Sequence, residues 1–187
     1  LVEGYLDVIA LDQHGFQGAV ATLCTALTLE QARLMRNLAP EVWVSYDGDE
    51  AGQTAALRAV ELLHQEGITA RVLRFPAGED PDDTIRRHGA EAFGALRPMP
   101  AMDFRLHRLE TGFDLADEES RRKFAMEACK TLSILREPVE VDHYLGKIAL
   151  KTGIAKDVLA SQFRSTRRGG AGVEHAQTPG SGKPALA

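Results

Sequence analysis

The chain has 187 residues, of which 44% are hydrophobic and 26% are charged. This length suits one ordinary domain with a smaller helical appendage, and the composition is that of a soluble globular protein, which excludes a disordered or fibrous chain. No apolar run approaches the roughly 20 residues of a membrane span, and the sequence does not open on a signal segment. We therefore expect a cytoplasmic protein without a membrane partner. Because the sequence opens on Leu1, we also expect it to be part of a longer protein.

The charges divide unevenly along the chain. Residues 1–100 contain 15 Asp and Glu against 8 Arg and no Lys, a net charge of −7. Residues 101–187 contain 12 Asp and Glu against 14 Lys and Arg, a net charge of +2. A protein that binds nucleic acid through its own cations presents a basic surface. Because the first half is acidic, we expect it to meet phosphate groups only through bound metal cations.

The first hundred residues alternate between strand and helix patterns. Short apolar runs predict buried strands at 42–46 and 70–75 and, less clearly because the run is shorter, at 19–21. Helical patterns cover 5–14, a segment after Thr28, and 50–66. Strands that alternate with helices are typical of a parallel sheet joined by helical crossovers. We therefore predict an α/β fold whose parallel sheet is flanked by helices.

Strand patterns end after Pro100, and the rest of the chain is expected to be helical. The predicted helices cover 101–109, 118–135, 139–151 and 155–163. Gly, Pro, Ser, Thr and Ala then dominate, which is typical of a linker. We expect an α/β domain over 1–97, a small α-helical subdomain over 98–164, and a flexible tail over 165–187.

Acidic residues follow the predicted strands at their carboxyl ends, where parallel sheets bind ligands. Asp47 and Asp49 flank Gly48 directly after the second strand pattern, so both carboxylates can turn toward one cation. Asp80 and Asp82 lie in the loop after the third strand pattern.

A third acidic pair lies near the start of the chain. If Leu1 and Val2 are the end of a strand, Glu3 lies at its carboxyl end and Asp7 follows one helical turn later. Taken alone, each acidic group has a simpler explanation: Asp80 precedes a proline and can cap a helix, and the Asp47–Asp49 pair can form a plain turn. An EF-hand is excluded because the twelfth loop position is Arg58, where a Glu is required. Together, carboxylates at the ends of three strands repel one another and favour a divalent cation.

Several segments closely resemble the Toprim domain of bacterial DNA primases of the DnaG type. The segments that carry the resemblance, in matching order and spacing, are 2–9, 25–28, 46–52, 55–59 and 78–82. Residues 137–145 resemble the start of a helix in that family's helical subdomain, so that the resemblance covers about residues 1–164. The family usually has Gly in place of Cys24 and a basic residue in place of Val141. We expect Cys24 to be a small buried residue rather than a reactive thiol.

The resemblance implies a Toprim-type fold, truncated in its first strand, and a function in DNA replication. The implied activity is that of a DNA-directed RNA polymerase, a nucleotidyltransferase that makes short RNA primers on single-stranded DNA. Ribonucleoside triphosphates, the template and the RNA primer are the implied partners, together with a replicative helicase that a further C-terminal domain would contact. The implied location is the bacterial cytoplasm.

The resemblance also identifies the expected site. We expect two or more Mg²⁺ or Mn²⁺ ions, and no zinc, because the candidate ligands are hard carboxylate oxygens. Glu3, Asp47 and Asp49 are the expected catalytic residues and primary ligands, and Asp7, Asp80 and Asp82 extend the metal site. We expect residues 1–187 alone to synthesise few or no primers, because similar primases carry a zinc ribbon and a basic subdomain ahead of this segment.

Two other functions remain open at this point. Another Toprim enzyme, a nuclease or a topoisomerase, would use the same metal ligands for different phosphodiester chemistry. A topoisomerase also requires a nucleophilic tyrosine, and we find no reason to choose Tyr5, Tyr46 or Tyr144. A non-catalytic module that binds a partner through its helices is the third possibility.

Overall fold

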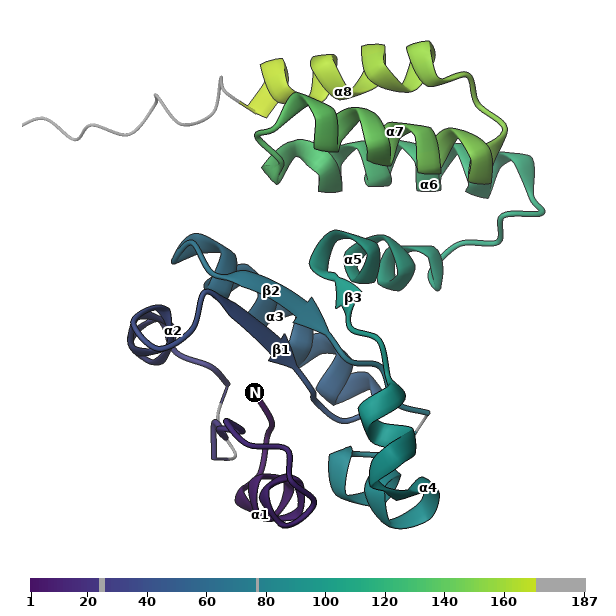
Figure 1. The fold of residues 1–187 in the computed structure, drawn as a ribbon. Coiled ribbons are helices and arrows are strands. Elements are labelled where there is room, and N and C mark those ends of the chain that lie inside the picture. The colour runs from purple at the N-terminus through teal and green to yellow at the C-terminus, as the bar shows by residue number, and fades with distance from the viewer. Residues whose placement is uncertain (24–25, 77, 171–187) are drawn as a thin grey trace, which may run out of the picture. The chain divides into compact units, whose positions relative to one another are not determined.

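The computed structural model describes residues 1–23, 26–76 and 78–170, so that the expectation for Cys24 lies outside the described residues. The chain divides into two compact units, Leu1–Arg105 and Leu106–Ala187. The division lies eight residues beyond the predicted end of the first domain, and the predicted three-segment organisation remains a prediction. The helices and strands are labelled in Figure 1, and their bounds are α1 (Tyr5–Gln13), α2 (Leu29–Arg36), β1 (Glu41–Val44), α3 (Glu50–Gln65), β2 (Thr69–Val72), α4 (Pro81–Ala95), β3 (Met99–Pro100), α5 (Ala101–Glu110), α6 (Glu118–Thr131), η1 (Leu132–Ile134), α7 (Pro138–Thr152) and α8 (Lys156–Gly170).

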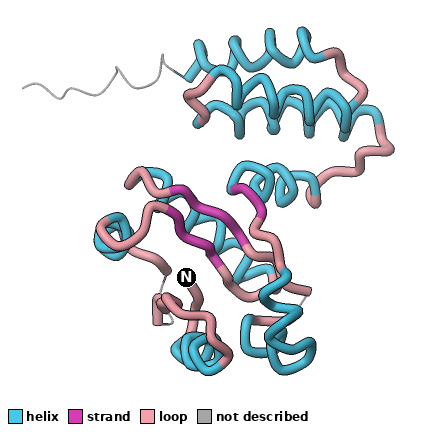
Figure 2. The backbone as a smooth tube through the Cα atoms, in the orientation of Figure 1, coloured by secondary structure: helices cyan, strands magenta, loops and turns pink. Residues whose placement is uncertain are grey.

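A small sheet forms the centre of the first unit, in the order β1-β2-β3 (Figure 2). β1 and β2 are parallel, with Val44 opposite Val72, and α3 is the crossover between them. The mixed α/β fold is therefore confirmed. β3 pairs antiparallel with β2, with Met99 opposite Val72. The sequence did not indicate this two-residue strand, because a Met-Pro pair has neither the length nor the alternation of a strand pattern.

Leu1 and Val2 extend the sheet beyond β1. The Leu1 nitrogen donates to the carbonyl oxygen of Trp43 (2.7 Å), and the Ser45 N–H donates to the carbonyl oxygen of Leu1 (2.8 Å). Val2 in turn forms a parallel bridge with Ala21, which is all that remains of the strand expected at 19–21. Glu3 therefore follows a parallel strand segment at the same edge of the sheet as the segment after β1.

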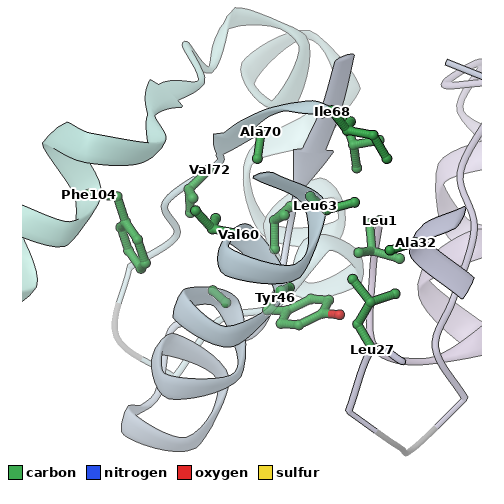
Figure 3. Close-up of a cluster of buried hydrophobic side chains, with 14 residues drawn as sticks. Leu1, Leu27, Ala32, Tyr46, Val60, Leu63, Ile68, Ala70, Val72 and Phe104 are labelled. Carbon is green, nitrogen blue, oxygen red and sulfur yellow. The ribbon is translucent and has the colours of Figure 1, made fainter. Parts of the chain in front are cut away.

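Buried apolar side chains of the first unit form two cores. Alternate strand residues, including Val44 and Val72, pack with Val60 and Leu63 of α3 (Figure 3). α1 and α4 contact each other beyond the carboxyl ends of β1 and β2 (Figure 1). The buried residues of this second core are Val2, Leu11, Leu73, Phe75, Ile85 and Phe93. The face of the sheet opposite α3 is more open, because Glu41, Trp43 and Thr69 are exposed.

The helix boundaries follow the capping residues in the sequence. The Thr28 hydroxyl accepts the Gln31 N–H and the Gln31 side chain accepts the Thr28 N–H, a complete capping box for α2. Asp117 caps α6 by accepting the Ser120 N–H (2.7 Å). α4 bends at Gly89, whose φ of +85° interrupts the helix.

The second unit is a helical bundle of α6, α7 and α8 joined by short connections. Its described interior consists of apolar side chains such as Phe124, Leu132 and Ile148. Val141 is also buried, so its departure from the family's usual basic residue suits a packing position. Residues 165–170, which we expected to belong to a flexible tail, form the last turns of α8 instead, and 171–187 lie outside the described residues. Within the described ranges no helix has the length and apolarity needed to cross a bilayer.

Candidate functional site

Most of the predicted acidic residues meet at the carboxyl edge of the sheet. The pKa of Asp47 is raised to about 6, first by its burial and then by the negative charges of Glu3, Asp80, Asp49 and Asp83. The structure therefore brings the three acidic segments of the chain close enough to repel one another, as their positions after the strands predicted.

Asp7 joins this cluster from α1 but is buried, with 7% of its surface exposed. Burial raises its pKa, and the charges of Asp80 and Asp47 raise it further. The backbone N–H groups of Gly4 and Asp82 act in the opposite direction, because they stabilise the charged form. The Asp7 carboxylate accordingly joins the start of α1, through Gly4 (3.1 Å), to the start of α4.

Asp82 and Asp83 are both paired with arginines of α4. The Asp82 carboxylate pairs with Arg86 one turn along α4 (3.1 Å), and the Asp83 carboxylate pairs with Arg87 (3.6 Å). Asp83, which we did not single out, also raises the pKa of Asp47. Both residues lie in the first turn of α4, where acidic residues are common because they favour the helix dipole, so the sequence held no signal that pointed to Asp83.

Three of the carboxylates in the cluster also accept a backbone N–H. Glu3 Oε1 accepts from Asp47 (3.3 Å), Asp49 Oδ1 accepts from Gly52 (2.7 Å), and Asp80 Oδ1 accepts from Asp83 (2.6 Å). Asp49 and Asp80 are thereby the N-caps of α3 and α4. The simpler explanation of Asp80 as a helix cap is correct. Asp80 is at the same time a member of the acidic cluster, because its charge acts on Asp47.

Gly48 lets the Asp-Gly-Asp turn approach the loop before α4, and Gly52 lets α3 begin close against the same turn. A Cβ atom on Gly48 would lie 2.3 Å from the carbonyl oxygen of Pro76, and one on Gly52 would lie 2.4 Å from the carbonyl oxygen of Asp47. Both contacts are with backbone, which cannot move aside as a flexible side chain can. The Asp-Gly-Asp turn and the loop before α4 therefore pack directly against each other.

The donor set fits a hard divalent cation in its chemistry. The candidate ligands are carboxylate oxygens, which suit Mg²⁺ and Mn²⁺. The pKa of Asp47 is raised first by burial and then by the neighbouring negative charges, and a cation would offset these charges. In the described part of the chain, no three Asp, Glu, His or Cys side chains are already arranged around one point as metal ligands. Several of these carboxylates instead accept a backbone N–H with one oxygen. The carboxylates would therefore have to move closer together to bind one cation.

The tyrosine beside this edge is not an activated nucleophile. Tyr46 is 3% exposed, and its pKa is raised to about 12, mainly by burial and further by the charge of Glu3. A nucleophilic tyrosine requires the opposite, an accessible hydroxyl with a lowered pKa. Of the other tyrosines, Tyr5 begins α1 and is 61% exposed, and Tyr144 is buried in the helical unit.

Two family models match the chain. Residues 1–85 match a Toprim-like family, and residues 102–157 match a family described as the DnaB-helicase binding domain of primase. We expected helicase contact only through a further C-terminal domain. The second match instead lies within this chain, over residues 102–157.

Curated relatives and solved structures agree with these matches. The chain is 40% identical to a DNA primase of Clostridium acetobutylicum over 85% of its own length and 27% of the relative's. It is also 40% identical to a DNA primase of Halalkalibacterium halodurans, over 89% of this chain and 28% of that one.

Among solved structures, the chain is similar to a DNA primase domain from Pseudomonas aeruginosa, with a TM-score of 0.68 and 31% identity over 89% of this chain and 53% of that one. A DnaG primase catalytic domain bound to single-stranded DNA gives a TM-score of 0.68 and 33% identity over 84% of this chain and 52% of that one. The chain thus spans a little more than a quarter of the length of these curated relatives and about half of these solved domains. It belongs to the bacterial DNA primases of the DnaG type.

Proposed function

We propose that this chain is the metal-binding part of the catalytic centre of a primase, which synthesises short RNA primers on single-stranded DNA by nucleotidyl transfer. The observation that carries the proposal is the cluster of strand-end carboxylates, in which burial and then mutual repulsion raise the pKa of Asp47 to about 6. A fold that concentrates negative charge at a ligand-binding edge, in a family whose members generally use a divalent metal, is suited to cations and phosphates.

Glu3, Asp47 and Asp49 are the proposed primary ligands and catalytic residues, and Asp7, Asp80 and Asp82 extend the site. A bound Mg²⁺ or Mn²⁺ would lower the pKa of the attacking 3′ hydroxyl and offset the charge of the triphosphate. Glu3 lies on a separate strand segment from the Asp-Gly-Asp turn, and the Asp47 N–H holds one of its oxygens (3.3 Å). Its carboxylate is our candidate to accept the proton of that hydroxyl.

Calorimetric titration of Mn²⁺ tests the metal site. We expect Asp47→Ala to weaken Mn²⁺ binding by about tenfold or more, since it removes a ligand and leaves the competing carboxylates in place. Asp12→Ala is the matched control, because Asp12 is an exposed aspartate of α1 whose charge is not among those acting on Asp47. Equal affinities in Asp47→Ala and in the unaltered chain would remove the basis of the proposal.

A primer-synthesis assay with the full-length protein tests the activity. Glu3→Gln, Asp47→Asn and Asp49→Asn should each lower the rate of dinucleotide formation about a hundredfold or more, the scale of a lost acid–base or metal-binding group. Nicking of plasmid DNA by the unaltered protein would favour a nuclease instead. No observation favours that alternative or a topoisomerase, and the buried, weakly acidic hydroxyl of Tyr46 argues against the latter.

We further propose that the helical unit contributes to helicase binding. The family model over residues 102–157 supports this, as do two apolar side chains of α7, Val139 and Leu150, which are 83% and 91% exposed. A double variant, Val139→Ser with Leu150→Ser, should weaken binding to the replicative helicase of the same cell in a surface plasmon resonance assay. Undiminished binding by a folded double variant would contradict this role for α7.

A further inference from the structure

Glu79 stands apart from the other acidic residues of its loop. It is 8% exposed, and its carboxylate turns toward α4. There it accepts hydrogen bonds from the Thr84 hydroxyl (3.2 Å) and from Arg87 Nη1 (3.3 Å), and His88 Nε2 lies 3.3 Å from Oε2.

Three partners on α4 hold the side chain of Glu79 in place. The Thr84 hydroxyl and Arg87 donate to different oxygens of its carboxylate, and His88 lies within hydrogen-bonding distance. A carboxylate with several partners is held in one orientation, because rotation would leave its charge unpaired.

The backbone of Glu79 is hydrogen-bonded to the Asp-Gly-Asp turn. The Glu79 carbonyl oxygen accepts the Gly48 N–H (2.9 Å), and the Glu79 N–H donates to the carbonyl oxygen of Pro76 (3.1 Å). Asp80, the next residue, caps α4. Glu79 is thus the residue through which α4, the Asp-Gly-Asp turn and the Asp80 cap are connected.

We propose that Glu79 is a positioning residue that locks the Asp-Gly-Asp turn to the start of α4 and so sets how closely the carboxylates of Asp47 and Asp80 approach. The lock opposes a force that the structure displays, the repulsion among these carboxylates. The inference rests on the proposed function in one respect, which is that the carboxylates so held bind cations. The lock itself is a property of the metal-free protein and can be tested without metal.

Amide hydrogen exchange followed by NMR in chelator tests the lock directly. Glu79→Ala should speed exchange of the Gly48 amide about tenfold or more, because its acceptor is no longer fixed, and should leave the α3 amide of Leu63 unchanged. Glu79→Gln keeps the side-chain length and its acceptor oxygen and should restore part of the protection. A plain loss of global stability would instead speed both amides together.

Glu41→Ala is the matched control. Glu41 is another hydrogen-bonded glutamate of the same unit, which accepts from Trp43 Nε1 (2.7 Å) and Arg71 Nε (2.9 Å) on β1 and β2, away from the acidic loops. It should leave the Gly48 amide unchanged. The partner variants Thr84→Val and Arg87→Met should reproduce part of the Glu79→Ala effect, and they test the lock even where Glu79→Ala does not fold.

Mn²⁺ titration supplies the second readout. Glu79→Ala should weaken Mn²⁺ binding about three- to tenfold, since the ligands must be brought together anew, whereas Glu41→Ala should not change it. An unchanged Gly48 exchange rate in folded Glu79 or Thr84 variants overturns the inference. So does an unchanged Mn²⁺ affinity beside a faster Gly48 exchange. A chain that binds no Mn²⁺ at all contradicts the proposed function, and the Gly48 exchange rates still decide whether Glu79 is the lock.

Discussion

At the scale of single residues, the pKa of Asp47 makes the metal-free protein sensitive to pH. An unfolded aspartate has a pKa near 3.9, whereas burial and the neighbouring carboxylates raise the pKa of Asp47 to about 6 in the folded protein. The folded state therefore holds a proton that the unfolded state has already released. The contribution of Asp47 to stability is complete below about pH 4 and is lost as the pH rises through about 6.

Urea denaturation in chelator between pH 4 and 8 should therefore show stability falling toward neutral pH. Asp47→Asn, which stays neutral, should reduce this fall but not abolish it, because the pKa of Asp7 is raised in the same direction. Saturating Mn²⁺ should reverse the trend. A stability that rises from pH 4 to 7 with the same slope in both proteins would show that repulsion at this edge is negligible.

Asp49 combines two roles that substitutions can separate. Its Oδ1 caps α3 through the Gly52 N–H, and its charge acts on Asp47. Asp49→Ala should lose about 1 kcal/mol of stability in chelator with the cap, whereas Asn is an equally good cap and should preserve it. Both variants should show a smaller rise in melting temperature on adding Mn²⁺. If Mn²⁺ raises the melting temperature of Asp49→Asn as much as that of the unaltered protein, Asp49 is a helix cap and not a metal ligand.

The sequence could predict these carboxylates as a group but not their individual contacts. Their positions after apolar runs are visible in the sequence, and so is the capping potential of Asp80 before Pro81. That the charge of Asp83 also acts on Asp47 depends on how α4 packs. Glu79 was overlooked for the same reason, since its partners Thr84, Arg87 and His88 become neighbours only once α4 has formed.

At the scale of elements, the fit between the Asp-Gly-Asp turn and the loop before α4 depends on Gly48. A Cβ atom there would lie 2.3 Å from the Pro76 carbonyl oxygen, so Gly48→Ala must separate the two loops. We expect a loss of about 1–3 kcal/mol, the usual scale of overpacking, measured by urea denaturation.

Gly94→Ala is the control for this prediction. Its added methyl group would lie 3.5 Å from the Phe16 ring, an ordinary contact, within the helical part of α4. Alanine should therefore stabilise the protein by up to about 1 kcal/mol. Equal losses in the two variants would show that the close approach at Gly48 is not what limits substitution there.

Elements with strong local signals agreed with the sequence, and those that depend on distant partners did not. The helix start at Thr28 and the apolar run at 42–46 are local signals, and they predicted α2 and β1 within a few residues. β3 exists because β2 offers an open edge to Met99, and Ala21 forms only a bridge to Val2. No periodicity within two or three residues can indicate such pairings.

At the scale of the whole molecule, the predicted domain boundary at 97/98 and the division after Arg105 lead to different expectations. Phe104 of α5 is fully buried in the core of the first unit, and Arg105 forms an ion pair with Glu61 of α3. β3 also pairs with β2 only if residues 99–100 are present. The first unit should therefore require the start of α5 in order to fold stably.

Two truncated chains distinguish the boundaries. Residues 1–110, which retain α5, should unfold cooperatively in urea, whereas residues 1–97 lose β3 and the Phe104 side chain and should be strongly destabilised. Removing a buried Phe side chain alone costs about 3–5 kcal/mol, a large part of the stability of a small domain. Phe104→Ala within 1–110 should reproduce most of this loss. Arg97→Ala within 1–110, which changes the last residue of the shorter chain, should not. Equal midpoints of urea unfolding for 1–97 and 1–110 would show that the first domain ends at residue 97 and that α5 belongs to the helical unit.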